Sequence, residues 1–194
     1  MADNIADRMA IADLINGWMF RDQGDWERLR GLFHSDGVIE VTWFEGLFSD
    51  FVDASMRMGA SKLRTKHLIG TPAIVFDGDR AIAETNAMIV GENVELSLGC
   101  SVHNRFYDLV EKRAGVWRIV KRQSIYDMGS FNFPKGVVEV DRAVVARYPD
   151  AYCALGYVLE VTGFPVKRIF ATKGSDLERA MKAAGEAWLH SRDR

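Results

Sequence analysis

The chain has 194 residues, enough for one well-filled core and too few for two domains of ordinary size. With 48% hydrophobic and 27% charged residues, its composition is typical of a folded globular protein. The 25 Lys and Arg and the 27 Asp and Glu leave a net charge of -2, so no overall basic field draws the chain to nucleic acid or to an anionic membrane.

Apolar residues at steps of three and four predict a first helix from Ile5 to about Phe20. Gly24 interrupts the pattern, and Asp25 can cap a second, short helix that leaves at an angle. Asp22 therefore lies at the corner between two helices, where its side chain can point inward.

Between residues 38 and 128 the predicted elements change from a strand and a helix to a run of strands. The predicted elements are a strand over 38–43, a short helix over 49–58, and four strands over 65–76, 80–90, 95–110 and 116–128. Helices followed by hairpins indicate an α+β protein with the helices on one face of a mostly antiparallel sheet. If that sheet curls, its concave face and the helices enclose a pocket.

The segment from Pro134 onward is helical in character. Helices are expected over 141–148 and 150–162, and Ser175 with Glu178 forms a capping box that opens a last helix. The apolar stripe predicted on this last helix consists of Leu177, Ala180, Met181, Ala184 and Trp188. We therefore expect an α+β domain over residues 1–133 and a helical C-terminal extension over residues 134–194, packed on the same domain or on a partner subunit.

The cysteines and the N-terminus indicate where the chain resides. Cys100 and Cys153 lack the spacing of metal ligands and are too few for a disulfide framework, so a reducing cytoplasm is the expected location. The N-terminus opens acidic without an apolar signal-peptide core, and no later run approaches the length of a membrane span. We expect neither secretion nor membrane insertion.

His67 is the candidate catalytic residue. It stands in an otherwise apolar strand, and a buried imidazole needs a partner for each ring nitrogen. A carboxylate that accepts from one nitrogen fixes the tautomer and leaves the other nitrogen free as a base. Asp25 is already used as a helix cap, which leaves Asp22 as the carboxylate. Spacing alone favours a core histidine bonded to backbone or water, whereas His34 and His190 are expected in solvent.

The chain contains none of the common cofactor or metal motifs. His-x-His, His-x-x-x-His and Glu-x-x-His spacings do not occur, so no metal site is expected. The glycine-rich phosphate-binding runs and the Gly-x-Ser-x-Gly nucleophile elbow are also missing. What remains is acid–base chemistry without a cofactor, or no chemistry.

Four segments resemble the scytalone dehydratases in order and spacing. They are Arg21 to Arg30, Leu63 to Gly70, Gly115 to Arg118, and Gly129 to Phe133. More broadly, about residues 5–133 are similar to SnoaL-like proteins of the nuclear transport factor 2-like superfamily. The resemblance implies a cone-shaped α+β fold around a ligand pocket and a dimer or trimer. It also implies an Asp–His pair, matching Asp22 and His67, that removes a proton next to a leaving group without a cofactor.

The chain departs from that family at three pocket positions. The two tyrosines with which scytalone dehydratases hold a water against the substrate carbonyl fall at Arg21 and Val41, and a second pocket histidine falls near Gly91. Scytalone itself is therefore not the expected substrate. The candidate pocket residues are Trp18, Arg21, Val41, Trp43, Phe44, Asn86, His103, Asn104, Tyr126 and Phe133, of which His103, Asn104 and Tyr126 are candidate electrophilic groups.

These observations lead to one expected function and two alternatives. The first is a cofactor-independent lyase or isomerase that acts on a cyclic, largely apolar small molecule, with His67 as general base and Asp22 as its orienter. The second is a non-catalytic module that binds a small molecule or a protein, since fold does not fix function. The third is an assembly subunit similar to the small subunit of ring-hydroxylating dioxygenases.

Overall fold

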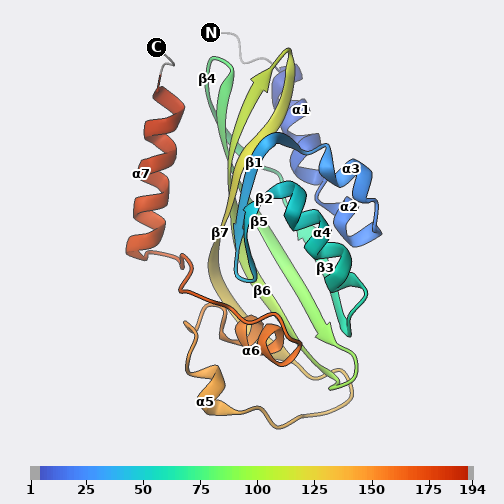
Figure 1. Cartoon of the computed structure of the whole chain (residues 1–194). Coiled ribbons are helices and arrows are strands. Elements are labelled where there is room, and N and C mark those ends of the chain that lie inside the picture. The colour runs from blue at the N-terminus through green and yellow to red at the C-terminus, as the bar shows by residue number, and fades with distance from the viewer. Residues whose placement is uncertain (1–4, 192–194) are drawn as a thin grey trace.

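The computed structural model describes residues 5–191 and consists of a curved seven-stranded sheet with helices on both sides (Figure 1). The elements are α1 Ile5–Asn16, α2 Met19–Gln23, α3 Trp26–Arg30, β1 Phe33–Val41, β2 Phe44–Leu47, α4 Phe48–Gly59, β3 Leu63–Ile69, β4 Ala73–Asp77, β5 Arg80–Asn93, β6 Leu98–Arg113, β7 Val116–Asn132, α5 Arg142–Val145, α6 Cys153–Val161 and α7 Asp176–His190.

The sheet runs in the order β2-β1-β7-β6-β5-β3, and β4 pairs with the far end of β5. All pairs are antiparallel except β1 with β7, which is parallel. Long twisted strands curl, and β5, β6 and β7 bend around the space beneath α4 (Figure 1). Helices α1 to α4 cover the concave side. The expected α+β cone with N-terminal helices on one face is confirmed.

Three element boundaries differ from the prediction. The first predicted helix is interrupted: α1 ends at Asn16, and α2 follows from Met19. The first strand begins earlier than predicted, at Phe33. It pairs with a short strand, β2, that was not predicted. The strand predicted over 65–76 divides into β3 and β4 around Pro72, because proline has no N–H to donate to a sheet. The predicted cap of α3 is confirmed, since the Asp25 carboxylate accepts from the Arg28 N–H at 3.2 Å.

Two apolar clusters fill the two ends of the cone. Trp18 stacks on Phe51 with ring centroids 5.5 Å apart, between the N-terminal helices and the sheet. At the other end, buried residues of α6 pack on β6 and β7 around Tyr126. The backbone of Tyr126 also pairs with Ala171 and Lys173, where β1 no longer borders β7. The segment after β7 therefore closes this end of the cone.

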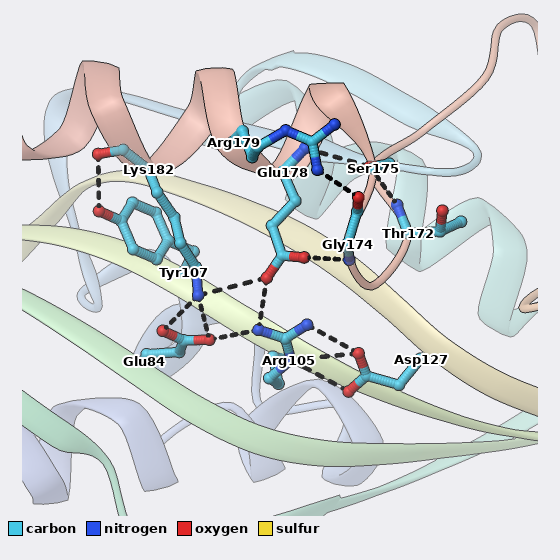
Figure 2. Close-up of polar contacts among 10 residues, drawn as sticks. All are labelled: Glu84, Arg105, Tyr107, Asp127, Thr172, Gly174, Ser175, Glu178, Arg179 and Lys182. Carbon is cyan, nitrogen blue, oxygen red and sulfur yellow. Dashed lines mark hydrogen bonds and ion pairs between the residues drawn. The ribbon is translucent and has the colours of Figure 1, made fainter.

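Helix α7 lies on the convex face of the sheet, where an ionic network holds it (Figures 1 and 2). Arg105 on β6 donates from Nη2 to Asp127 at 2.8 Å, and from Nη1 to Glu84 at 2.6 Å and Glu178 at 2.7 Å. Lys182 Nζ lies 3.1 Å from the Glu84 carboxylate. One guanidinium thus joins β5, β6 and β7 to α7.

The capping box at the start of α7 is half formed. Ser175 Oγ accepts from the Glu178 N–H at 3.2 Å, as predicted, but the Glu178 carboxylate accepts from the Gly174 N–H at 2.6 Å and from Arg105. Burial raises the pKa of Glu178, and the hydrogen bonds from Arg105, the Gly174 N–H and Lys182 outweigh it and lower the pKa to about 2. Glu178 is therefore ionised and tied to the sheet.

The apolar stripe predicted on α7 is right in part. Met181 and Trp188 are half-buried and pack on the cluster around Tyr107, whereas Leu177, Ala180 and Ala184 are exposed. The buried residues of α7 are Glu178, Gly185 and Leu189. The polar contacts of Glu178 and Lys182 fix the rotation of the helix. Gly185 then faces Tyr107, and a Cβ added there would lie 2.4 Å from the Tyr107 hydroxyl oxygen. A helical pattern read for apolar residues alone does not detect an ionic contact face.

Gly185→Leu should lower the free energy of unfolding by about 1–3 kcal/mol, because the new side chain cannot fit against Tyr107. Leucine favours helix over glycine by roughly 1 kcal/mol, so the clash must exceed that gain. Urea denaturation measures the difference. Ala184→Leu, one position away on the exposed face, is the matched control and should change stability by less than about 0.5 kcal/mol. Equal stabilities for the two variants would contradict the tight α7 contact.

Candidate functional site

A cavity opens on the concave face of the sheet, beneath α4 and α6. Most of its lining is apolar and comes from α4, α6 and strands β1, β3, β5, β6 and β7. Its polar lining side chains include Arg21, Thr65, His67, Ser124 and Tyr126. Water-sized molecules can centre over about 40 Å³ of it, room for on the order of three waters. The cavity therefore suits a small ligand.

Asp22 and His67 meet at the wall of this cavity. The His67 ring nitrogen Nδ1 lies 2.7 Å from Asp22 Oδ1, and the His67 backbone N–H donates to Asp22 Oδ2 at 2.7 Å. Helix α2 supplies the carboxylate, and strand β3 supplies the imidazole. The two side chains are 1% and 6% exposed. Because one carboxylate holds both the ring and the backbone of the same residue, the ring orientation is fixed.

The protonation states of the pair follow from its surroundings. Burial raises the pKa of Asp22, but the hydrogen bonds and charge interactions with His67, together with the charge of Arg21, outweigh it, so the pKa lies below its ordinary value. Burial is the main cause that lowers the pKa of His67; the charges of Arg21 and Arg122 add to it, and Asp22 opposes it. Asp22 is therefore ionised and His67 neutral at neutral pH.

The remaining ring nitrogen of His67 is available for chemistry. The ionised Asp22 can only accept, so Nδ1 carries the proton and Nε2 carries the lone pair. Nε2 makes no hydrogen bond to any residue in the described range 5–191, and His67 lines the cavity. The Trp18 ring packs edge-on at 5.9 Å and limits the movement of the imidazole. The arrangement is that of an oriented general base.

Arg21 adds a buried positive charge beside the pair. Its Nη1 donates to Thr65 Oγ1 at 2.8 Å, and its Nη2 lies 3.3 Å from Met58 Sδ. The guanidinium also lies 5.9 Å from the centroid of the Trp43 ring. Burial lowers the pKa of Arg21 to about 10, although the charge of Asp22 acts to raise it. Arg21 also borders a second, more open cleft between α2, α4 and β3.

A second buried ion pair was missed by the sequence analysis. Arg122 Nε and Nη2 donate to the two Asp108 oxygens at 2.7 and 2.8 Å, and both side chains are 0% exposed. The guanidinium carbon lies 4.1 Å from the centroid of the Phe106 ring and 4.6 Å from that of Trp18. Asp108 and Arg122 face each other across the β6–β7 hairpin. The register of that hairpin was the signal that could have revealed them.

The predicted pocket residues divide into four groups, the last of which is exposed. Trp18, Arg21, Val41, Trp43 and Tyr126 line the cavity, and so does Gly91, where the family resemblance puts a second histidine. Phe44 and Phe133 pack into the two apolar clusters and do not line it. Asn104 is buried on the concave side but is not in the lining; its Nδ2 lies 3.5 Å from Ser124 Oγ.

The assignments of Asn86 and His103 to the pocket were wrong. Both are exposed and project from the convex face of the sheet, because their neighbours at odd spacing, Ala87 and Val102, point into the core. Strand periodicity groups side chains by face, but it does not identify the concave face. His34, expected in solvent, is also buried, with Nε2 2.9 Å from the Glu111 carbonyl oxygen.

Helix α6 supplies lining residues that the sequence analysis did not assign to the cavity. Leu155, Val158 and Leu159 close the cavity from the end opposite the N-terminal helices. Cys100 also lines it, and burial raises the pKa of this thiol to about 12, so it is a protonated, apolar surface.

Metal and membrane sites were also sought in the structure. Over residues 5–191, His, Cys, Asp and Glu side chains form no group of three or more that could hold a metal ion. In the same range, no helix is both long enough and apolar enough to cross a membrane.

Comparisons with known proteins agree on the fold. A family model of the SnoaL-like domain matches residues 3–123, more than half of the chain. The uncharacterized protein AN9274 of Emericella nidulans is 28% identical in an alignment of 183 positions that covers 82% of this chain and 73% of that protein.

Two solved structures illustrate the likeness. One is described as a candidate scytalone dehydratase from Novosphingobium aromaticivorans, with a TM-score of 0.60 and 18% identity over 73% of this chain and 96% of that chain. The other is the hexachlorocyclohexane dehydrochlorinase LinA-type3 from Novosphingobium barchaimii, with a TM-score of 0.58 and 20% identity over 72% of this chain and 97% of that chain. At these identities the likeness establishes the fold alone.

Proposed function

Because the chain belongs to the SnoaL-like family, we propose that it is a cofactor-independent lyase or isomerase that takes a proton from a cyclic, largely apolar small molecule. The observation that carries the proposal is the 2.7 Å contact between Asp22 Oδ1 and His67 Nδ1, with the opposite ring nitrogen unbonded at the cavity wall. His67 is the general base, and Asp22 orients it. Two structural neighbours are named for eliminations, a dehydration and a dehydrochlorination, which supports this reaction class.

The proposed step conserves protons and electrons without a cofactor. His67 Nε2 accepts the proton from a ring carbon, and the C–H electron pair forms a double bond to the neighbouring carbon. In an elimination the leaving group departs from that neighbour with its bonding pair. In an isomerisation that neighbour already carries a double bond, whose electron pair shifts to the next carbon and takes the proton back from His67 there. Asp22 stabilises the imidazolium that forms, and a positioned base contributes roughly 10²–10⁴-fold in rate.

A non-catalytic binding module is the second candidate. The narrowness of the cavity favours it, because a space of about 40 Å³ for water centres leaves little room for a reacting substrate to reorient. A cytoplasmic location and a homo-oligomeric state remain predictions for either function.

His67→Gln should reduce proton transfer by about 10²-fold or more, because glutamine keeps the size of the side chain and lacks a base. Deuterium incorporation and loss of the leaving group can be followed with a panel of single-ring β-hydroxy and β-halo ketones and carboxylates in D₂O. The matched control is His103→Gln on the convex face, which should retain the full rate. Ligand binding to both variants without any exchange by the unmodified protein would favour the binding module.

A further inference from the structure

The positive charge of Arg21 has no carboxylate of its own in the cavity. Among residues 5–191, Asp22 has the one carboxylate within 4.0 Å of its guanidinium, and that separation is 4.0 Å, beyond hydrogen-bond distance. Both Asp22 oxygens already accept hydrogen bonds from His67. The Arg21 side chain is nevertheless only 6% exposed, so water solvates little of it.

The hydrogen-bonding capacity of Arg21 is mostly unused. A guanidinium has five N–H groups; one donates to Thr65 Oγ1 and a second meets the weak acceptor Met58 Sδ. The other three find no acceptor among the described residues, and Nε is fully buried. A donor without an acceptor on a buried cation costs more than one on a neutral group, so an acceptor bound beside Arg21 would be stabilised.

Among the described residues that line the cavity, only Thr65 and Met58 accept from the Arg21 side chain. Thr42 and Tyr126 bond to each other, since the Tyr126 hydroxyl lies 3.3 Å from Thr42 Oγ1. Trp18 Nε1 is a second buried donor without a partner among the described residues. His67 Nε2 is an acceptor on the cavity wall, but the proposed reaction requires its lone pair. The side chains of Arg21 and His67 therefore line the same cavity, one as a cation and one as a base.

We propose that Arg21 binds an anionic oxygen group of the ligand, in the simplest case a carboxylate, so that the cavity selects cyclic organic acids. The inference rests on the proposed function, because it concerns the ligand of the same cavity. A carboxylate on Arg21 would fill its free N–H groups with charge-assisted hydrogen bonds, which are strong in a dry site. The apolar ring would then lie against Trp18 and Phe51, next to His67. The narrow cavity restricts the ligand to about one ring.

Binding of matched acids and amides tests this inference. We would titrate the full chain with benzoate, cyclohex-1-ene carboxylate and their carboxamides, and follow tryptophan fluorescence and calorimetric heat. Each carboxylate should bind about 10- to 100-fold more tightly than its amide, the range expected for hydrogen bonds to a charged group. Arg21→Met should remove this preference, and Arg21→Lys should keep part of it. Arg28→Met removes an exposed arginine from the neighbouring helix and should change neither affinity.

The outcomes separate this inference from the proposed function. Equal affinities for acids and amides, or a preference that survives in Arg21→Met, would overturn the anion site. Amide binding by Arg21→Met verifies that the variant keeps its cavity. His67→Gln should retain the preference for acids even though it loses proton transfer. The acid and amide affinities can therefore be compared even if the protein proves to have no catalytic activity. If Arg21→Met slows exchange but does not weaken carboxylate binding, Arg21 acts only on the reacting state, and the proposed selection of acids is wrong.

Discussion

Asp22→Asn will reduce proton transfer by about 10²–10⁴-fold while the chain stays folded. Asp22 now accepts from both the backbone N–H and the Nδ1–H of His67. The asparagine side chain has only one oxygen, so its NH₂ group must point at one of the two His67 nitrogens. Either it faces an N–H donor unfavourably, or it donates to Nδ1, which must then lose its proton. In the second case the proton moves to Nε2, the nitrogen that must remove the substrate proton. The rate of deuterium exchange measures the loss, and ¹⁵N NMR of the imidazole identifies the tautomer.

The pH dependence gives an independent check on Asp22. Burial and the charges of Arg21 and Arg122 hold the pKa of His67 below 6.5, while Asp22 raises it. The base acts when neutral, so the acid limb of kcat/KM should lie below pH 6.5 in the unmodified protein. Without the Asp22 charge that limb should move to still lower pH. Asp25→Asn is the matched control, because asparagine also caps helices well and the Asp25 carboxylate accepts from the Arg28 N–H and not from His67. A limb that moves upward would contradict the assigned contact.

Separating the buried pair Arg122 and Asp108 should cause the largest loss of stability. Either Asp108→Val or Arg122→Met alone leaves one polar partner fully buried without its counter-ion, and we expect a loss of about 3–5 kcal/mol in the free energy of unfolding. Burial raises the pKa of Asp108, and the two hydrogen bonds from Arg122 oppose that rise. Arg122→Met therefore leaves an Asp108 carboxyl that binds a proton more readily.

The double variant decides whether the effect belongs to the pair. Asp108→Val with Arg122→Met removes both charges and leaves apolar side chains between Trp18 and Phe106, so most of the loss should be recovered. Urea denaturation of the four proteins gives the coupling energy. Additive losses in the double variant would mean that the two residues stabilise the fold independently, contrary to their two direct hydrogen bonds.

Local patterns determined much of this protein from the sequence alone. Apolar periodicity predicted the N-terminal helices and the long hairpins, and the turn at Asp77-Gly78-Asp79 joins β4 to β5 with a φ of 61° at Gly78, a conformation that glycine adopts without strain. The same reasoning singled out Asp22 and His67, because an uncommitted carboxylate and an imidazole in an apolar strand are visible without coordinates. These features depend on neighbours within a few positions of the chain.

Only the tertiary structure decided which surfaces face the cavity. The direction of sheet curvature put His103 and Asn86 outside, and it depends on how whole strands twist and on which side the helices pack. The rotation of α7 was set by Arg105, a residue more than seventy positions away from Glu178 in the chain. The closing of the cavity by α6, the parallel pairing of β1 with β7 and the contact between Arg122 and Asp108 likewise join segments distant in sequence. Periodicity carries no information about such contacts, because it records only the face on which a side chain lies and not what it meets there.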